Sequence, residues 1–120
     1  MLPIPYDIDV ESLRERKVTE VSYAPGAITL FFGDKAYITI NGYFALRLGK
    51  QRHEYYRLEP LNGDYGLLNL LGKEVSGVYL NGNRDSMAIE FTDECCRLEL
   101  MGHMAEDMYT IHIGDREVEV

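Results

Sequence analysis

Residues 13–40 read LRERKVTEVSYAPGAITLFFGDKAYITI, and residues 70–100 repeat the same pattern as LLGKEVSGVYLNGNRDSMAIEFTDECCRLEL. The matched positions are mostly apolar: Leu13/Leu70, Val18/Val75, Thr19/Ser76, Val21/Val78, Leu30/Ile89, Phe32/Phe91, Asp34/Asp93, Ile38/Leu98 and Ile40/Leu100. The offset grows from 57 residues at the first valines to 60 at the last aliphatic pair, so each length difference falls in a turn. An internal repeat of this kind predicts two structurally equivalent halves.

Each copy has the alternation of a three-stranded β-meander. The predicted strands are 18–23, 27–32 and 36–40 in the first copy and 75–80, 87–91 and 96–100 in the second. Pairing across the loops sets Phe31 opposite Tyr37 in the first copy and Glu90 opposite Arg97 in the second. This register keeps one face of each meander apolar, and a slip by one residue would expose that face.

A short helix is predicted before each meander and a further hairpin after it. The helices are expected at 10–16 after Asp9 and at 65–71 between Asp64 and Gly72, and the hairpins at 43–58 around loop 49–52 and at 109–120 around Gly114 and Asp115. We therefore expect a mainly β protein of about ten short strands, with two pseudo-symmetric meander repeats and one or two short helices, closing as a sandwich or flattened barrel. Residues 1–120 are expected to form one domain of two repeats, about 9–60 and 61–120.

The N-terminus and the cysteines favour the cytoplasm. No run approaches the roughly 18 apolar residues of a membrane span, and the start MLPIPYDIDV has no basic region, unlike a signal peptide. Cys95 and Cys96 are adjacent, so on a strand their side chains point to opposite faces and a disulfide between them is disfavoured. We expect reduced thiols and no membrane association.

The net charge of −8 is unevenly distributed. Residues 1–60 hold eight acids and eight bases, whereas residues 61–120 hold twelve acids and four bases. An acidic half repels phosphate backbones, so direct nucleic-acid binding is not expected, and it attracts a basic protein partner. Solubility is the alternative explanation of the excess.

The outward positions of the two meanders differ in character. Phe31 and Tyr37 stand in the first where the second has Glu90 and Arg97. An outward aromatic pair should be covered, either by the chain's own 43–58 hairpin, by a second copy in a homodimer, or by a different partner.

One segment has a mixture of side chains that suits acid–base chemistry or a small ligand. It comprises His53, Glu54, Tyr55, Tyr56 and Arg57, and a basic patch adjoins it at Arg47, Lys50, Arg52 and Arg57. A ligand pocket or active site near His53, Tyr55, Tyr56 and Arg57 is thus one hypothesis. The simpler interpretation is a β-strand with alternate residues in solvent, because the sequence pattern supplies no nucleophile with an orienting base.

Metal and cofactor sites are not expected. His103, Glu106 and Asp107 are of metal-binding type, but their spacing matches no ligand motif, and His112 opposite Glu117 is a surface pair. The chain has no GxGxxG, P-loop, HExxH, GxSxG or EF-hand motif.

The segments GKEVSGV, AIEFTDE, RLEL and YTIHIGD, half-repeated as KVTEV, LFFGDK and ITI, resemble those of small bacterial two-repeat β proteins of uncharacterised function. Some proteins of this appearance are polymorphic-toxin immunity proteins, which neutralise a toxin by binding it. The resemblance covers about residues 13–120 and implies a non-catalytic, immunity-type inhibitor. Combined with the charge distribution, it predicts docking of a basic toxin on Glu90, Asp93, Glu94, Glu99, Glu106 and Asp107.

Overall fold

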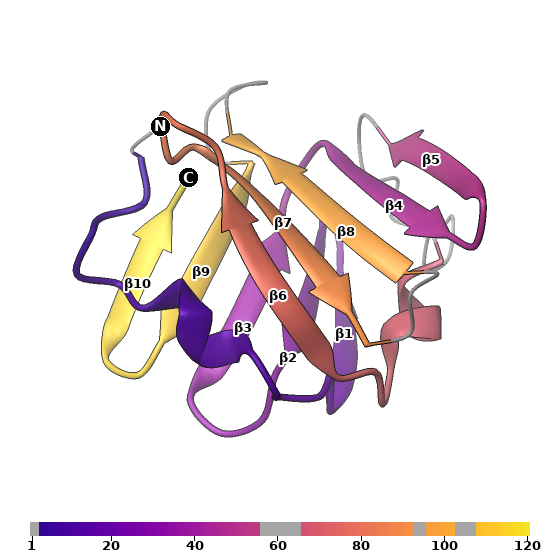
Figure 1. Ribbon diagram of the computed structural model, residues 1–120, viewed down its shortest axis with the longest axis horizontal. Coiled ribbons are helices and arrows are strands. Elements are labelled where there is room, and N and C mark those ends of the chain that lie inside the picture. The colour runs from indigo at the N-terminus through magenta and orange to yellow at the C-terminus, as the bar shows by residue number, and fades with distance from the viewer. Residues whose placement is uncertain (1–2, 56–65, 93–95, 103–107) are drawn as a thin grey trace.

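Two five-stranded antiparallel sheets pack face to face in the computed structural model, which describes residues 3–55, 66–92, 96–102 and 108–120 (Figure 1). The strands are β1 (Glu20–Ala24), β2 (Ala27–Phe31), β3 (Ala36–Ile40), β4 (Phe44–Leu48), β5 (Gln51–Tyr55), β6 (Val75–Leu80), β7 (Ser86–Phe91), β8 (Cys96–Met101), β9 (Tyr109–Ile113) and β10 (Arg116–Glu119). The first sheet has the order β1-β2-β3-β9-β10 and the second has β5-β4-β8-β7-β6. The predicted mainly β class is confirmed, and of the two predicted closures the protein adopts the sandwich.

Each half of the chain contributes its hairpin to the sheet of the other half. Strand β3 pairs with β9 through Ile38 and Ile111, and β4 pairs with β8 through Leu46 and Leu98. The chain crosses between the sheets at residues 41–43, directly after β3. Exchanging β1–β5 with β6–β10, strand for strand, converts one strand order into the other, so the two sheets are topologically equivalent.

The predicted register within the meanders is confirmed. Leu30 lies opposite Ile38, and Ile89 lies opposite Leu98. In the β9–β10 hairpin, Val118 lies opposite Ile111, as predicted. Apolar residues at alternate positions therefore all reach the inner faces.

The loop of the β4–β5 hairpin is shorter than predicted. Strand β5 begins at Gln51, so the loop is Gly49 and Lys50 rather than residues 49–52. Gly49 has a φ of 67°, and Gly114 at the start of the β9–β10 loop has a φ of 63°. Both hairpins thus use a two-residue loop that begins with a left-handed glycine, which matches the twist of the flanking strands.

The two predicted helices are single 3-10 turns, η1 (Val10–Leu13) and η2 (Leu67–Leu70). In η2, the buried side chains are Leu67 and Leu70, which one 3-10 turn brings to the same side because they are three residues apart. Gly72 ends this segment in the left-handed region, as predicted. The predicted N-cap, Asp64, lies outside the described residues.

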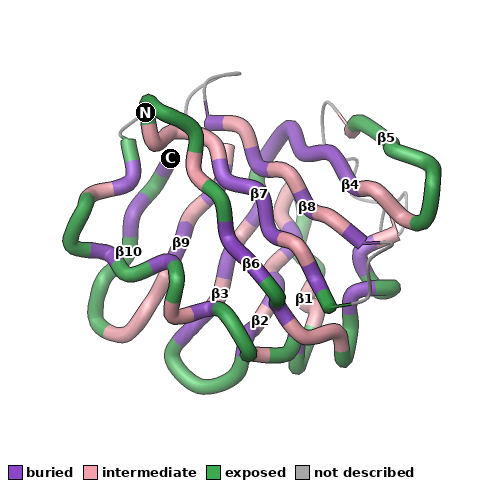
Figure 2. Tube along the Cα trace, viewed as in Figure 1, coloured by how far each residue is buried: buried purple, intermediate pink, exposed green. Residues whose placement is uncertain are grey.

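The core lies between the sheets, where the buried residues of both inner faces meet (Figure 2). Phe32 and Phe91, which the repeat aligns, are 0% and 2% exposed.

The N-terminal segment is held to this core by Arg84, whose guanidinium donates to the carbonyl oxygens of Ile4 and Pro5. In the described ranges no helix is long and apolar enough to cross a membrane.

Candidate binding surfaces

The outer face of the first sheet carries two rows of side chains that run across all five strands. The first row is Glu20, Phe31, Tyr37, His112 and Glu117. The second row is Ser22, Thr29, Thr39, Thr110 and Glu119. The first three strands of each row come from one half of the chain and the last two from the other.

Three neighbouring rings, Phe31, Tyr37 and His112, form the centre of the first row. The Phe31 and Tyr37 centroids are 5.7 Å apart with a tilt of 49°, and the Tyr37 and His112 rings are parallel at 4.5 Å. Nδ1 of His112 lies 3.6 Å from a carboxylate oxygen of Glu117. In the neighbouring row, the hydroxyls of Thr29 and Thr39 are hydrogen-bonded at 2.9 Å. Cross-strand contacts of these kinds stabilise the pairing of β2, β3, β9 and β10.

The charge of this face is entirely acidic. Among the ten positions of the two rows there are three glutamates, Glu20, Glu117 and Glu119, and no lysine or arginine. All three glutamates are exposed, and they stand on the two edge strands. The half-buried rings of Phe31 and Tyr37 lie between them.

The outer face of the second sheet has different side chains at the equivalent positions. Its rows are Gly77, Glu90, Arg97, Arg47 and Arg52, and Tyr79, Ala88, Glu99, Ala45 and Glu54. Three arginines and three glutamates give these ten positions no net charge. The inner faces share their apolar pattern, so the two halves differ on the outside.

Ion pairs connect two of these arginines, Arg52 and Arg97, with the three glutamates of this second face. Arg52 donates to Glu99 and to Glu54, each at 2.8 Å. The predicted cross-strand pair of Arg97 with Glu90 is present. The hydrogen bonds to Glu99 and then Glu54 raise the pKa of Arg52, so this network keeps its charge.

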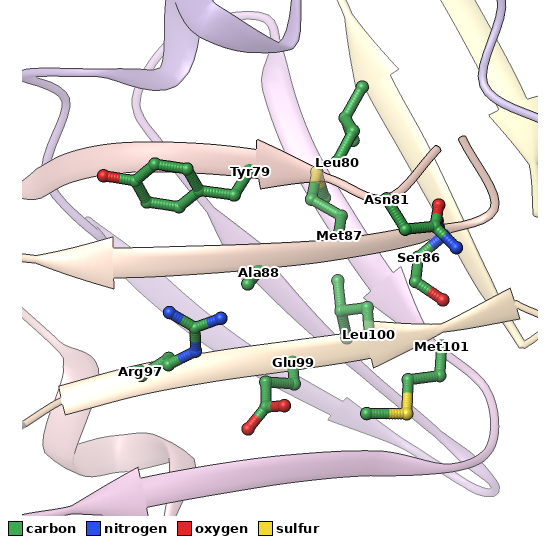
Figure 3. A pocket seen from close by; sticks show the side chains of 10 residues that line it. All are labelled: Tyr79, Leu80, Asn81, Ser86, Met87, Ala88, Arg97, Glu99, Leu100 and Met101. Atoms are coloured by element: carbon green, nitrogen blue, oxygen red, sulfur yellow. Dashed lines mark hydrogen bonds between the residues drawn. The ribbon is translucent and has the colours of Figure 1, made fainter. Parts of the chain in front are cut away.

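A shallow hollow of about 260 Å³ lies on the second face, over Ala88 (Figure 3). Tyr79 lies on one side of Ala88 and Arg97 and Glu99 on the other. The Tyr79 ring covers Gly77, where a Cβ would lie 2.7 Å from the phenol oxygen, and it is 54% exposed. The hollow follows from the small side chain at position 88 and is open to solvent.

The structure places two of the six predicted partner-binding acids. Glu90 is paired with Arg97 and Glu99 with Arg52, so both belong to the balanced network. The other four lie outside the described residues: Asp93, Glu94, Glu106 and Asp107.

The hypothetical ligand site on β5 is divided between two faces. Glu54 points outward, where it accepts a hydrogen bond from the Tyr43 hydroxyl at 2.9 Å. His53 and Tyr55 are on the opposite side of the strand, and Tyr55 stacks on Phe44 at 5.0 Å. Strand alternation therefore separates His53 from Glu54. Tyr56 and Arg57 lie outside the described residues.

Of the three alternatives for covering Phe31 and Tyr37, coverage by the 43–58 hairpin is wrong for the described part of that hairpin. Strands β4 and β5 extend the second sheet, where β8 satisfies the backbone hydrogen bonds of β4. They do not lie over the outer face of the first sheet. His112 and Glu117, in contrast, are opposite each other as predicted.

The remaining candidate residues are those considered for metal binding, the Tyr43 hydroxyl and Cys96. His103 lies outside the described residues, and within the described ones no group of three or more histidine, cysteine or acidic residues is placed to hold a metal ion. Burial raises the pKa of Tyr43 above its usual value, with the Glu54 hydrogen bond adding to the effect. Cys96 is buried at 5% exposure.

No family model, no curated protein and no solved structure matches this chain.

Sequence reasoning identified Phe31 and Tyr37 but did not connect them with His112 and Glu117. The missing information was the pairing of β3 with β9, which brings the second half's hairpin to the first half's meander.

Proposed function

We propose that this protein is a non-catalytic, cytoplasmic binding protein that engages a basic protein partner. In the sharper form of this proposal the partner is a toxin or effector, and binding neutralises it, as in an immunity protein. The observation that carries the proposal is the excess of twelve acids over four bases in residues 61–120. Such an excess accelerates encounter with a basic protein and disfavours acidic ones.

The distribution of differences between the two halves supports binding rather than catalysis. Most of the matched apolar residues of the repeat lie in the core, whereas the outer rows of the two sheets share no side-chain pattern. Flat sheet faces are suited to contacting a large partner, while catalysis favours a concave site with converging groups. On the second face, Arg52 pairs with Glu54 and Glu99 and Arg97 pairs with Glu90, so these groups do not converge on a common site.

Affinity capture from the native host tests the proposal. The tagged protein is used as bait, the captured protein is identified by mass spectrometry, and its isoelectric point and its gene's position are recorded. We expect a basic protein encoded beside this gene, with growth inhibition that co-expression of this chain relieves.

Association rates measured across a salt series give the second readout. The rate should be high at low salt and fall markedly toward physiological ionic strength, where the screening length is about 8 Å. Binding that is independent of salt, or a copurifying small molecule held against Tyr55, would contradict the proposal.

A further inference from the structure

The first sheet presents an aromatic centre with an acidic border on its outer face. We refer to Glu20, Phe31, Tyr37, His112, Glu117 and Glu119 as the acidic aromatic face. Protein interfaces commonly combine a central group of aromatic residues with a polar border. The Phe31–Tyr37–His112 stack has the first property, and the three exposed glutamates have the second.

The charges on this face select the type of partner. Its rows hold three glutamates and no lysine or arginine, whereas the opposite outer face holds three of each sign. The acidic excess of the described sheet faces is therefore located on the first sheet. A partner that covers it needs lysine or arginine side chains at the border and apolar contacts at the centre.

A second copy of this chain is not expected to bind to the acidic aromatic face. Symmetric packing of this face on itself would bring the three glutamates of one copy close to the three of the other, and each chain carries a net charge of −8. Like charges at an interface oppose association, and no basic residue stands in these rows to offset them.

We infer that the acidic aromatic face is the docking surface for a lysine- and arginine-rich surface of a different protein. The inference rests on the proposed function and makes it specific. The rings of Phe31 and Tyr37 form the apolar centre of the contact, and Glu20, Glu117 and Glu119 attract and orient the partner.

A lysine homopeptide is the first probe. Its binding to the isotope-labelled protein is followed by amide chemical shifts in nuclear magnetic resonance. We expect the shifts to concentrate on the strands of the first sheet, β1, β2, β3, β9 and β10. Shifts concentrated on β4, β7 and β8, or spread evenly over the molecule, would overturn the inference.

Charge reversal supplies a matched comparison. Glu117→Lys combined with Glu119→Lys should weaken peptide binding about tenfold, because both charges border the face. Glu11→Lys combined with Glu15→Lys makes the same change of net charge at exposed positions near η1, and should weaken it less than about threefold. Equal losses in the two double variants would mean a general charge effect and would refute a specific face.

The partner captured from the host is the second probe. Phe31→Ala should weaken its binding about thirtyfold, the effect of removing a central aromatic residue. Tyr79→Ala, which removes an exposed ring from the opposite face, should have less than about a threefold effect. Unfolding curves verify that both variants are folded before affinities are compared.

The outcomes separate this inference from the proposed function. One outcome is a basic partner that binds with salt dependence while its affinity is unchanged by Phe31→Ala and by the Glu117 and Glu119 reversals. That result would support the proposed function and refute the acidic aromatic face as its docking surface. If no salt-dependent protein partner exists, the function fails, and the peptide experiment alone decides whether the face attracts cations. A wild-type dimer in sedimentation that Phe31→Glu dissociates would assign the face to a second copy and overturn the inference.

Discussion

The ring of Tyr37 lies parallel to the imidazole of His112, with centroids 4.5 Å apart and planes within 4°. Tyr37 belongs to β3 of the first half of the chain and His112 to β9 of the second. The stack therefore crosses the junction at which one half's meander accepts the other half's hairpin. The equivalent junction in the second sheet is between β8 and β4.

Separated halves of the chain should not fold alone. Without residues 61–120, β3 loses its neighbour β9 and β4 loses its neighbour β8, so both strands have an exposed edge. We expect fragments 1–60 and 61–120 each to lack dispersed amide resonances and to regain them when mixed at equal concentration. A fragment that is folded by itself would contradict the exchanged arrangement of hairpins.

Phe32 and Phe91 should make similar contributions to stability. Both are in the core, at 0% and 2% exposure, and the repeat places them at equivalent positions. Phe32→Ala and Phe91→Ala should each lower the free energy of unfolding by about 3 to 5 kcal/mol, measured by denaturant titration. A loss below about 1 kcal/mol at one of them would show that the two sites are not equivalent.

The sequence predicted the meander registers because apolar alternation excludes a slip by one residue and the short loops fix the pairing. A slip by one residue would move Leu30 and Ile38 from the core to solvent. The exchange of hairpins was not predictable in the same way. Ile111 would meet an aliphatic neighbour on either β3 or β8, Ile38 or Leu98, so alternation does not distinguish the two pairings.

The candidate surface was predictable in part for the same reason. Outward Phe31 and Tyr37 follow from the register of a single hairpin, which is a local property. Their contact with the His112–Glu117 pair depends on the long-range pairing of β3 with β9. The sequence also did not predict that η2 is a single 3-10 turn. Leu67 and Leu70 are three residues apart, and both an α-helix and a 3-10 turn bring residues with that spacing to one side.

Gly102 should not tolerate a side chain. A Cβ there would lie 2.5 Å from the carbonyl oxygen of Asp85 and 2.6 Å from a methyl carbon of Val120. The Asp85 carbonyl cannot easily move away from the added Cβ, because it accepts hydrogen bonds from the Gly102 amide and the Tyr109 hydroxyl. Gly102→Ala should cost about 1 to 3 kcal/mol in denaturant unfolding.

The control for this substitution is Gly82→Ala, in the loop between β6 and β7. A Cβ at Gly82 meets no atom within 4 Å, and its backbone is outside the left-handed region. Its stability should change by less than about 0.5 kcal/mol, as at other surface positions. Equal losses at the two glycines would rule out the close approach as the cause.

Tyr109→Phe should make the protein less sensitive to alkaline pH. Burial raises the pKa of the Tyr109 hydroxyl above its usual value of 10.0, with the nearby Asp85 carboxylate adding to the shift. Above pH 10 the unfolded chain therefore loses this proton while the folded chain keeps it, so the free energy of unfolding falls as pH rises.

Below pH 9 the variant should be about 1 kcal/mol less stable than wild type, because it lacks the 3.0 Å hydrogen bond to the Asp85 carbonyl. By pH 11 the wild type loses about 1.4 kcal/mol through this ionisation and the variant does not, so the difference between them should disappear or reverse slightly. Urea unfolding of both proteins between pH 7 and 11 measures this. A difference that stays constant over that range would mean that the Tyr109 hydroxyl ionises as readily in the folded chain as in the unfolded one.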